Sequence, residues 1–447
     1  MPEKHKRKHL TSFQMIILGF AGVILLGSLL LMLPVSSAER VVTPFDQALF
    51  TSTSAVCVTG LVVQDTGSYW SGFGQAVILL LIQTGGLGVV TVAVSVFMLS
   101  GRKISLMQRS TMQDAISAPK VGGIVRLTKF ILRGTFLIEG IGAFIYSFYY
   151  CREYGLLKGI WFSVFHAVSA FCNAGLDIMG ADSLIPYHSN LLMMLNTSFL
   201  IIMGGIGFIV WWDTVEAFRR IRTKKCSIRS AWNGVHLQTK IAIFMTLLLL
   251  IGGTVVIYFL ERSNPDTLGN LSEKDRILNA FFQSVTLRTA GFAAVPQAAL
   301  RPVTAFFGAL LMMIGGSPVG TAGGMKTVTI AVIFFTFAAM IRNHEDTEVF
   351  KRNIPVSVVK KAVAIVFLSM STIFIMTILL MATNDVNLLD ALFEVASAVC
   401  TVGLSRNLTP VLNTAGQIII MICMYIGRVG PISMAVSYTH LTLPTKL

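Results

Sequence analysis

The sequence has 447 residues, of which 54% are hydrophobic and 13% are charged, whereas a soluble globular domain usually has about 25% charged residues. Its apolar residues form a series of stretches of about 20 residues, each long enough to cross roughly 30 Å of hydrocarbon. This composition argues against a soluble domain. It predicts an all-α integral membrane protein whose main surroundings are a lipid bilayer.

The formal net charge is +14, and the distribution of the basic residues explains it. They gather in the amino terminus and in the stretches 101–133, 219–240 and 342–361, while the stretches between these contain fewer Lys and Arg. Such alternation is typical of membrane proteins whose basic segments face the cytoplasm, so we expect the amino terminus on that side. The charge therefore gives no reason to expect a nucleic-acid partner.

Eight apolar stretches are candidates for spanning helices. The first follows a basic segment, as the apolar part of a signal peptide would, but it is too long and has no small-residue cleavage site after it. The eight stretches are 13–33, 75–99, 130–150, 190–213, 239–260, 303–341 with an interruption, 357–381 and 413–436.

A short motif recurs between successive pairs of these stretches. It is a Phe ten residues before a Gly, with a large apolar residue after the Gly, and three of its copies also have Ser six and Cys three residues before the Gly. The glycines are 112 to 116 residues apart, and they are Gly60, Gly175, Gly291 and Gly403. Four copies at near-constant spacing indicate an internal fourfold repeat.

The 10–14 residues before each of these glycines have a helical pattern but are too short to cross a bilayer. A short helix followed by extended backbone lies at membrane depth only where protein buries it or where it lines water. Four such loops around one axis would present rings of backbone carbonyls, as potassium filters do. The alternative is that the four glycines only allow close helix packing.

The predicted fold is therefore all-α, with eight transmembrane helices in four pseudo-fourfold helix–pore loop–helix repeats around one pore, like a potassium channel. K⁺ is expected at the backbone level of the four glycines. The predicted filter residues are Val58, Thr59, Gly60, Asn173, Ala174, Gly175, Thr289, Ala290, Gly291, Thr401, Val402 and Gly403.

With these four glycines and the segment Arg288-Thr-Ala-Gly-Phe292, the chain resembles the Trk/Ktr/HKT superfamily of cation transporters from about residue 10 to residue 436. Within that superfamily it is most similar to the membrane subunits of bacterial Ktr potassium-uptake systems (KtrB type). Some plant members have Ser at the first glycine and move sodium. Because this chain has Gly at all four positions, the resemblance implies potassium.

The resemblance also implies partners and a location. It implies a multi-pass protein of the bacterial plasma membrane, and a homodimer on a cytosolic regulatory ring of KtrA type, whose RCK domains bind ATP, ADP or NAD. The stretches 101–125 and 217–238 are candidate docking surfaces for that ring. No cofactor is expected in this chain; K⁺ is the transported ion, and Na⁺ is a candidate activator.

Two features break the repeat, and the resemblance implies that the first of them is a gate. The third downstream stretch is interrupted at 315–324, which implies unwound backbone at membrane depth, and the alternative is a simple kink. Arg428 lies inside the last apolar stretch, where a charge must face protein or water; we expect it either at the gate or paired for packing. The predicted gate residues are Gly315, Gly316, Ser317, Gly320, Thr321, Gly323, Gly324, Lys326 and Arg428.

Four other charged residues also have predicted roles. Arg288 replaces the repeated Cys, and we expect it to point behind the filter and to bond pore-helix carbonyls or a carboxylate. Asp65, Asp177 and Glu394 are candidates for outer carboxylates that attract cations.

The predicted organisation leaves other functions open. An alternating-access carrier is disfavoured because there are four parallel repeats and one interrupted span. An enzyme is not expected, since the spans lack clustered catalytic residues. A sodium or less selective monovalent cation transporter of the same fold is the remaining alternative.

The predicted organisation has six parts. They are a basic cytoplasmic amino terminus (1–12), repeat 1 (13–100), repeat 2 with its cytoplasmic linker (101–216), repeat 3 with the gate loop (217–341), repeat 4 (342–436) and a tail that looks foreign to the natural protein (437–447).

Overall fold

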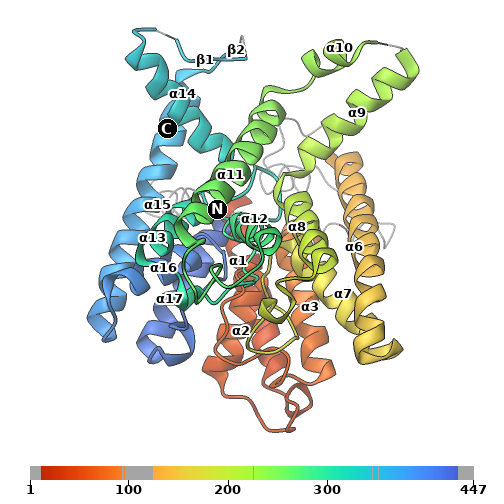
Figure 1. Cartoon of the computed structure of the whole chain (residues 1–447), viewed down its shortest axis with the longest axis vertical. Helices are drawn as coiled ribbons and strands as arrows, with labels where there is room; N and C mark the ends of the chain where they lie inside the picture. Colours follow the sequence, from red (N-terminus) through yellow and green to blue (C-terminus); the bar gives the residue numbers. More distant parts are fainter. Residues whose placement is uncertain are drawn as a thin grey trace, which may run out of the picture.

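The computed structural model describes residues 12–92, 95, 124–224, 226–344, 346–350 and 352–430. Nearly all regular structure in these residues is helical (Figure 1). The exception is a small antiparallel pair of strands, β1 (Glu348–Val349) and β2 (Arg352–Asn353). The expected basic amino terminus, most of the 101–125 linker and the 437–447 tail lie outside the described residues.

Each of the four predicted repeats contains a long helix followed by a short one. The long helices have 20 to 31 residues, and their apolar composition is that of membrane-crossing helices. The short helices are mostly buried in the centre of the molecule. The long helices are α1 (Ser12–Leu31), α6 (Ile124–Tyr154), α11 (Leu237–Glu261) and α15 (Val356–Thr383), and the short ones are α2 (Phe45–Cys57), α7 (Leu156–Cys172), α12 (Glu273–Thr286) and α16 (Leu388–Val399).

The helices that follow the short helix of each repeat differ in length and continuity more than the sequence suggests. In the described residues, four helices are long and apolar enough to cross a membrane, or five if the bent pair α8–α9 is one span. Eight spans therefore remain a prediction. The downstream helices are α3 (Gly72–Leu87), α8 (Leu191–Gly205) with α9 (Phe208–Lys224), α13 (Pro302–Met313) with α14 (Thr327–Ile341), and α17 (Thr414–Val429); single 3₁₀ turns lie at Pro34–Ser36, Ile185–Tyr187, Gln297–Ala299 and Thr409–Val411.

The stretch 190–213, predicted to be unbroken, is bent by 93° between α8 and α9. Gly207 stands at the bend with a φ of 96°, and the Phe208 N–H donates to Val319 O at 2.8 Å. The bend makes room for the interruption in repeat 3. Two spans are thus broken rather than one, so the number of broken spans no longer argues against a carrier.

One end of the molecule carries α9, α10 (Ile228–Asn233), the end of α14 and the β1–β2 pair (Figure 1). There the buried Asp213 carboxylate accepts hydrogen bonds from His236 Nδ1 at 2.8 Å and from Thr239 Oγ1 at 2.5 Å. These bonds fix the turn that leads from α9 through α10 into α11. The candidate docking stretch 217–238 lies on this end.

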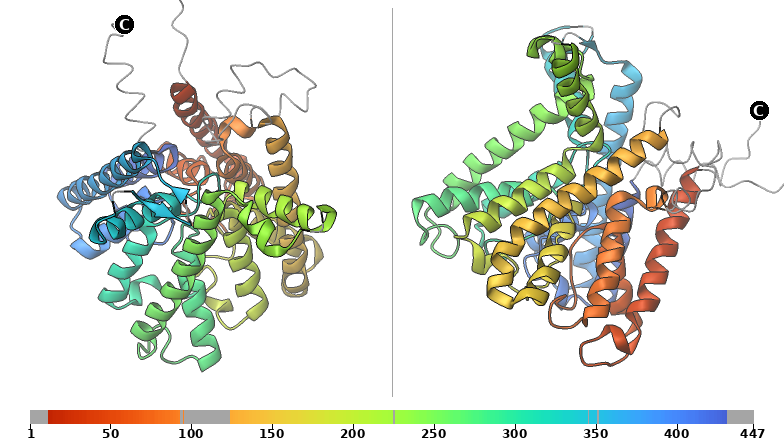
Figure 2. Two further views of the ribbon diagram at one scale, coloured as in Figure 1. Left: turned by 90° about the horizontal axis from the view of Figure 1, so that it is seen from above. Right: turned by 90° about the vertical axis from the view of Figure 1, so that its right-hand side faces the viewer.

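The first and last helices lie side by side, and this contact closes the arrangement of helices seen from above in Figure 2. The Tyr425 hydroxyl of α17 donates to Ile17 O of α1 at 2.7 Å. Repeat 4 is therefore next to repeat 1.

Candidate ion pathway

Every short helix ends in the same backbone turn. The residue two before the repeated glycine and the glycine itself have positive φ, while the residue between them does not. Glycine adopts this conformation at little cost, but other residues are strained by it. The φ angles are 55° for Val58, 59° for Asn173, 62° for Thr289 and 52° for Thr401, and 95°, 65°, 86° and 94° for Gly60, Gly175, Gly291 and Gly403.

Hydroxyl groups of the short helices support these turns. In repeats 1 and 4 the glycine N–H donates to the serine six residues earlier, from Gly60 to Ser54 Oγ at 3.1 Å and from Gly403 to Ser397 Oγ at 3.0 Å. In repeat 3 the Thr286 hydroxyl instead donates to a backbone carbonyl after the glycine, at 2.7 Å. The repeated serines are therefore structural supports of the turns.

The four glycines meet in a ring, which we call the glycine ring. A Cβ atom added to any of them would come within 3.0 Å of the carbonyl oxygen that precedes the glycine of the next repeat. Only glycine fits such a contact without a shift of backbone. The contacts run from Gly60 to Ala174 O, from Gly175 to Ala290 O, from Gly291 to Val402 O and from Gly403 to Thr59 O. The cyclic order of the repeats is therefore 1-2-3-4.

The interruption in repeat 3 is a compact loop, residues 314–326, which we call the crossing loop. Its two ends are paired, because the Gly315 N–H donates to Met325 O at 2.9 Å. The Ser317 N–H donates to Gly205 O at the end of α8 at 2.8 Å. The loop is therefore held by the bent second span as well as by its own helices.

The crossing loop touches repeats 2 and 4. Thr321 Oγ1 lies 2.9 Å from Asn173 Oδ1 in repeat 2, and the backbone of Gly323 packs against the side chain of Thr401 in repeat 4. Repeat 3, which carries the loop, lies between repeats 2 and 4 in the cyclic order. These contacts therefore place the loop on the inner side of repeat 3, at the level where the short helices end.

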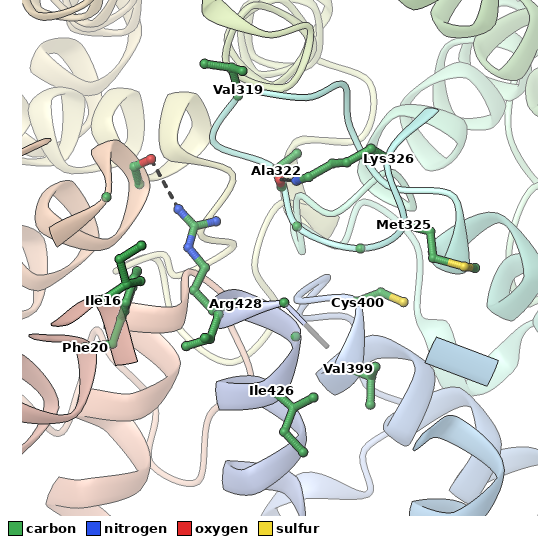
Figure 3. A pocket seen from close by; sticks show the side chains of 18 of the residues that line it. Ile16, Phe20, Val319, Ala322, Met325, Lys326, Val399, Cys400, Ile426 and Arg428 are labelled. Carbon is green, nitrogen blue, oxygen red and sulfur yellow. Dashed lines mark hydrogen bonds between the residues drawn. The ribbon is translucent and has the colours of Figure 1, made fainter. Parts of the chain in front are cut away.

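Two cations hold neighbouring carbonyls of this loop. Figure 3 shows both side chains, with Lys326 bonded to Ala322 and Arg428 bonded to α3. Arg428 Nη1 donates to Thr321 O at 2.5 Å, and its Nη2 donates to Gly86 O at 3.2 Å and also to Gly85 O. Lys326 Nζ donates to Ala322 O at 2.6 Å. Both side chains line a cavity of about 280 Å³ next to the loop. Arg428 thus meets the loop at Thr321.

Arg288 points behind the glycine ring, but its partner is not the expected one. The side chain is buried, and its Nη2 lies 3.5 Å from Thr246 Oγ1 of α11. In the described part of the chain, its Nε has no hydrogen-bond partner, and no carboxylate pairs with it. It occupies a small space bordered by Ile201, Leu250 and Gly316.

Two of the three candidate outer carboxylates are also less open than expected. Glu394 is fully buried and accepts hydrogen bonds from Ser405 Oγ at 2.8 Å and from the Thr409 hydroxyl. Asp177 is partly buried, with Ser183 Oγ at 2.6 Å. Glu394 therefore supports the fourth turn and cannot act as an exposed attractor of cations.

The sequence interpretation missed a buried polar contact between repeats 1 and 2. Glu139 of α6 is 5% exposed, and Gln83 Nε2 of α3 donates to it at 3.4 Å. Cys172, at the end of α7, lies 3.6 Å from Gln83 Oε1. A glutamate in the middle of an apolar stretch was a visible signal.

Taken together, a ring of glycine turns at the ends of four buried short helices defines a protein of the membrane-channel or transporter class. A family model described as a cation transport protein, TrkH, matches residues 3–444. The chain belongs to this family, which is one of cation transporters and not of enzymes.

Named relatives match nearly the whole chain. The potassium/sodium uptake protein NtpJ of Enterococcus hirae is 38% identical over 439 residues, which cover 97% of this chain and 94% of the relative. The Ktr system potassium uptake protein B of Bacillus subtilis is 39% identical over 425 residues, with coverage of 95% and 92%. The crystal structure of the potassium transporter TrkH from Vibrio parahaemolyticus matches the fold with a TM-score of 0.73 at 18% identity, covering 99% of this chain and 87% of that one.

Proposed function

We propose that this chain is the pore-forming membrane subunit of a potassium-uptake system. The observation that carries the proposal is the glycine ring, in which four turns with alternating backbone meet around one axis. Such backbone presents carbonyl oxygens that replace the hydration shell of K⁺. The four short helices end at the ring, so the partial negative charge of their carboxyl ends favours a cation there.

The crossing loop is the gate of this pore. It extends inward from repeat 3 between repeats 2 and 4, and Arg428 links it to α3 of repeat 1 on the opposite side. Arg428 and Lys326 add two positive charges beside it. A cation that leaves the glycine ring toward this side meets both a backbone obstruction and electrostatic repulsion. Opening requires the loop to move out of the axis.

Regulation comes from outside the chain. A cytosolic ring of KtrA type, with RCK domains that bind ATP, ADP or NAD, contacts the end that carries α9, α10 and the β1–β2 pair. The working unit is a homodimer in the bacterial plasma membrane, the amino termini are cytoplasmic, and Na⁺ acts as an activator. The names of the relatives support uptake of K⁺ by a Ktr-type system.

Growth rescue of a bacterium deficient in potassium uptake tests this function, with rubidium and sodium influx measured in the same cells. Wild type should rescue growth and take up rubidium in preference to sodium. Gly→Ser or Gly→Asp at any of the four ring positions should lose this preference. Gly252→Ser is the matched control, because a Cβ at Gly252 in α11 meets no atom within 4 Å. Unchanged discrimination in all four ring variants would overturn the assignment.

A second candidate is a less selective transporter of potassium and sodium, which the printed name of NtpJ favours. The same influx measurement separates the two. Comparable rubidium and sodium influx through the wild-type protein would identify the less selective transporter.

A further inference from the structure

We propose that the side chains of Asn173 and Thr321 form a latch that holds the crossing loop closed beneath the glycine ring. The proposal rests on the function proposed above, because it takes the crossing loop as the gate. It adds the particular hydrogen bond whose loss releases the loop, and it assigns Asn173 to gating rather than to ion binding.

Thr321 is the most heavily bonded residue of the loop, and its side chain is fully buried. Its hydroxyl lies 2.9 Å from Asn173 Oδ1 and 3.0 Å from Phe171 O, and its N–H donates to Gly204 O at 3.1 Å. Its carbonyl accepts from Arg428. Three of its contacts therefore go to repeat 2 and one goes to repeat 4, on opposite sides of the axis.

Asn173 is the unusual member of its repeat position. Val58, Thr289 and Thr401 occupy the equivalent positions with φ between 52° and 62°. Since Val58 adopts the turn without an amide, the turn itself does not require one. Within the described residues, Asn173 Nδ2 has no hydrogen-bond partner, so the amide contacts the crossing loop through Oδ1. The amide group thus serves the contact with Thr321.

The latch is strong enough to hold the loop and weak enough to open. The Thr321 hydroxyl has one hydrogen and two buried acceptors, and both acceptors need another donor once the loop has moved away. One neutral hydrogen bond of this kind changes a two-state equilibrium by about two- to tenfold. Removal of the hydroxyl should therefore lower the ratio of closed to open protein by that factor.

The test uses Thr321→Val, which keeps the shape of the side chain and removes the hydroxyl, and Thr321→Ser as the control that keeps it. Asn173→Val removes the acceptor and introduces the residue that repeat 1 already carries at this position. Rubidium influx is measured in potassium-depleted cells that lack other uptake systems, at equal amounts of membrane-inserted protein.

We expect Thr321→Val and Asn173→Val each to raise rubidium influx by about two- to tenfold, with the preference for rubidium over sodium unchanged. Thr321→Ser should stay near the wild-type rate. The double Val variant should be no faster than either single variant, because both remove the same bond.

Two results would overturn the latch. One is a Thr321→Val protein that is inserted normally and transports at or below the wild-type rate, and the other is a double variant whose effects multiply. Gly403→Ser, measured in parallel, tests the underlying function separately. If it abolishes discrimination while Thr321→Val is silent, the pore assignment stands and the latch is wrong. If Gly403→Ser still discriminates, the pore assignment fails.

Discussion

Gly403 of repeat 4 packs directly against the carbonyl oxygen of Thr59 in repeat 1, and this contact closes the glycine ring. It joins residues from the two ends of the chain. The other three contacts of the ring join successive repeats. The ring therefore needs all four glycines, but the four contacts are not equally close.

The four glycines should differ in their tolerance of a side chain. Gly403 has the closest contact and a φ of 94°, whereas Gly175 has a φ of 65° and leaves 2.7 Å to its neighbour. A non-glycine residue in such a conformation costs about 1–3 kcal/mol before any clash. Alanine should therefore lower rubidium influx and thermal stability most at Gly403 and least at Gly175. An inverted order, measured at equal protein amounts, would contradict the geometry of the ring.

Arg428→Gln should raise rubidium influx. The guanidinium donates to carbonyls of both the crossing loop and α3, and a hydrogen bond to a charged group contributes about 1.5–3 kcal/mol. Loss of one such bond favours the open loop by about ten- to a hundredfold. The rubidium influx of Arg428→Lys should fall between that of Arg428→Gln and that of wild type, because a single ammonium cannot bridge both partners. Arg262→Gln, at an exposed position beyond α11, is the control.

The hydroxyl of Ser54 should stabilise the first turn. It accepts the Gly60 N–H at 3.1 Å inside a fully buried environment. Ser54→Ala leaves that N–H without its partner, at a cost of about 1–3 kcal/mol. We expect a lower unfolding temperature in detergent and weaker discrimination between rubidium and sodium. Ser147→Ala, which removes a hydroxyl on the exposed face of α6, should change neither quantity.

Asp177 should make stability depend on pH. Burial raises the pKa of its carboxyl to about 6, although the bonds from Ser183 and the Met179 N–H lower it and Asp65 raises it further. The folded protein then holds this proton more tightly than the unfolded chain, so the contribution is present at low pH and is lost as the pH rises through about 6. The unfolding temperature at pH 5 minus that at pH 7.5 should be larger for wild type than for Asp177→Asn. Equal differences would show that Asp177 does not titrate in this way.

Glu139 should be replaceable by Gln but not by Leu. Its partners are the Gln83 amide and the Cys172 thiol, and in the described part of the chain no Lys or Arg forms an ion pair with it. Glu139→Gln keeps a hydrogen-bonding group, while Glu139→Leu leaves the Gln83 amide unpaired at a cost of about 1–3 kcal/mol. Thermal unfolding in detergent measures both. An equally unstable Glu139→Gln protein would mean that the negative charge itself is needed.

The sequence allowed some of this to be predicted, because repetition can be seen without a structure. The four glycines, the interruption at 315–324 and the odd placement of Arg428 all stand out against an apolar background. The bend at Gly207 does not, because a glycine at a helix break and a glycine in a helix contact look alike in a hydrophobic stretch. The partners of Arg288 and the Asn173–Thr321 contact depend on packing between repeats, which spacing along the chain does not encode.

The covalent joining of the four repeats also has a consequence for charge. Four identical subunits around an axis would have to place any arginine at this level four times, and four guanidinium groups crowded around one narrow passage would repel one another strongly. Here Arg428 and Lys326 occur once each, Arg428 on α17 of repeat 4 and Lys326 in the crossing loop of repeat 3. A single polypeptide can thus place different charges in different repeats beside the axis, so that the height of the electrostatic barrier can be changed by substitution of one residue in one repeat.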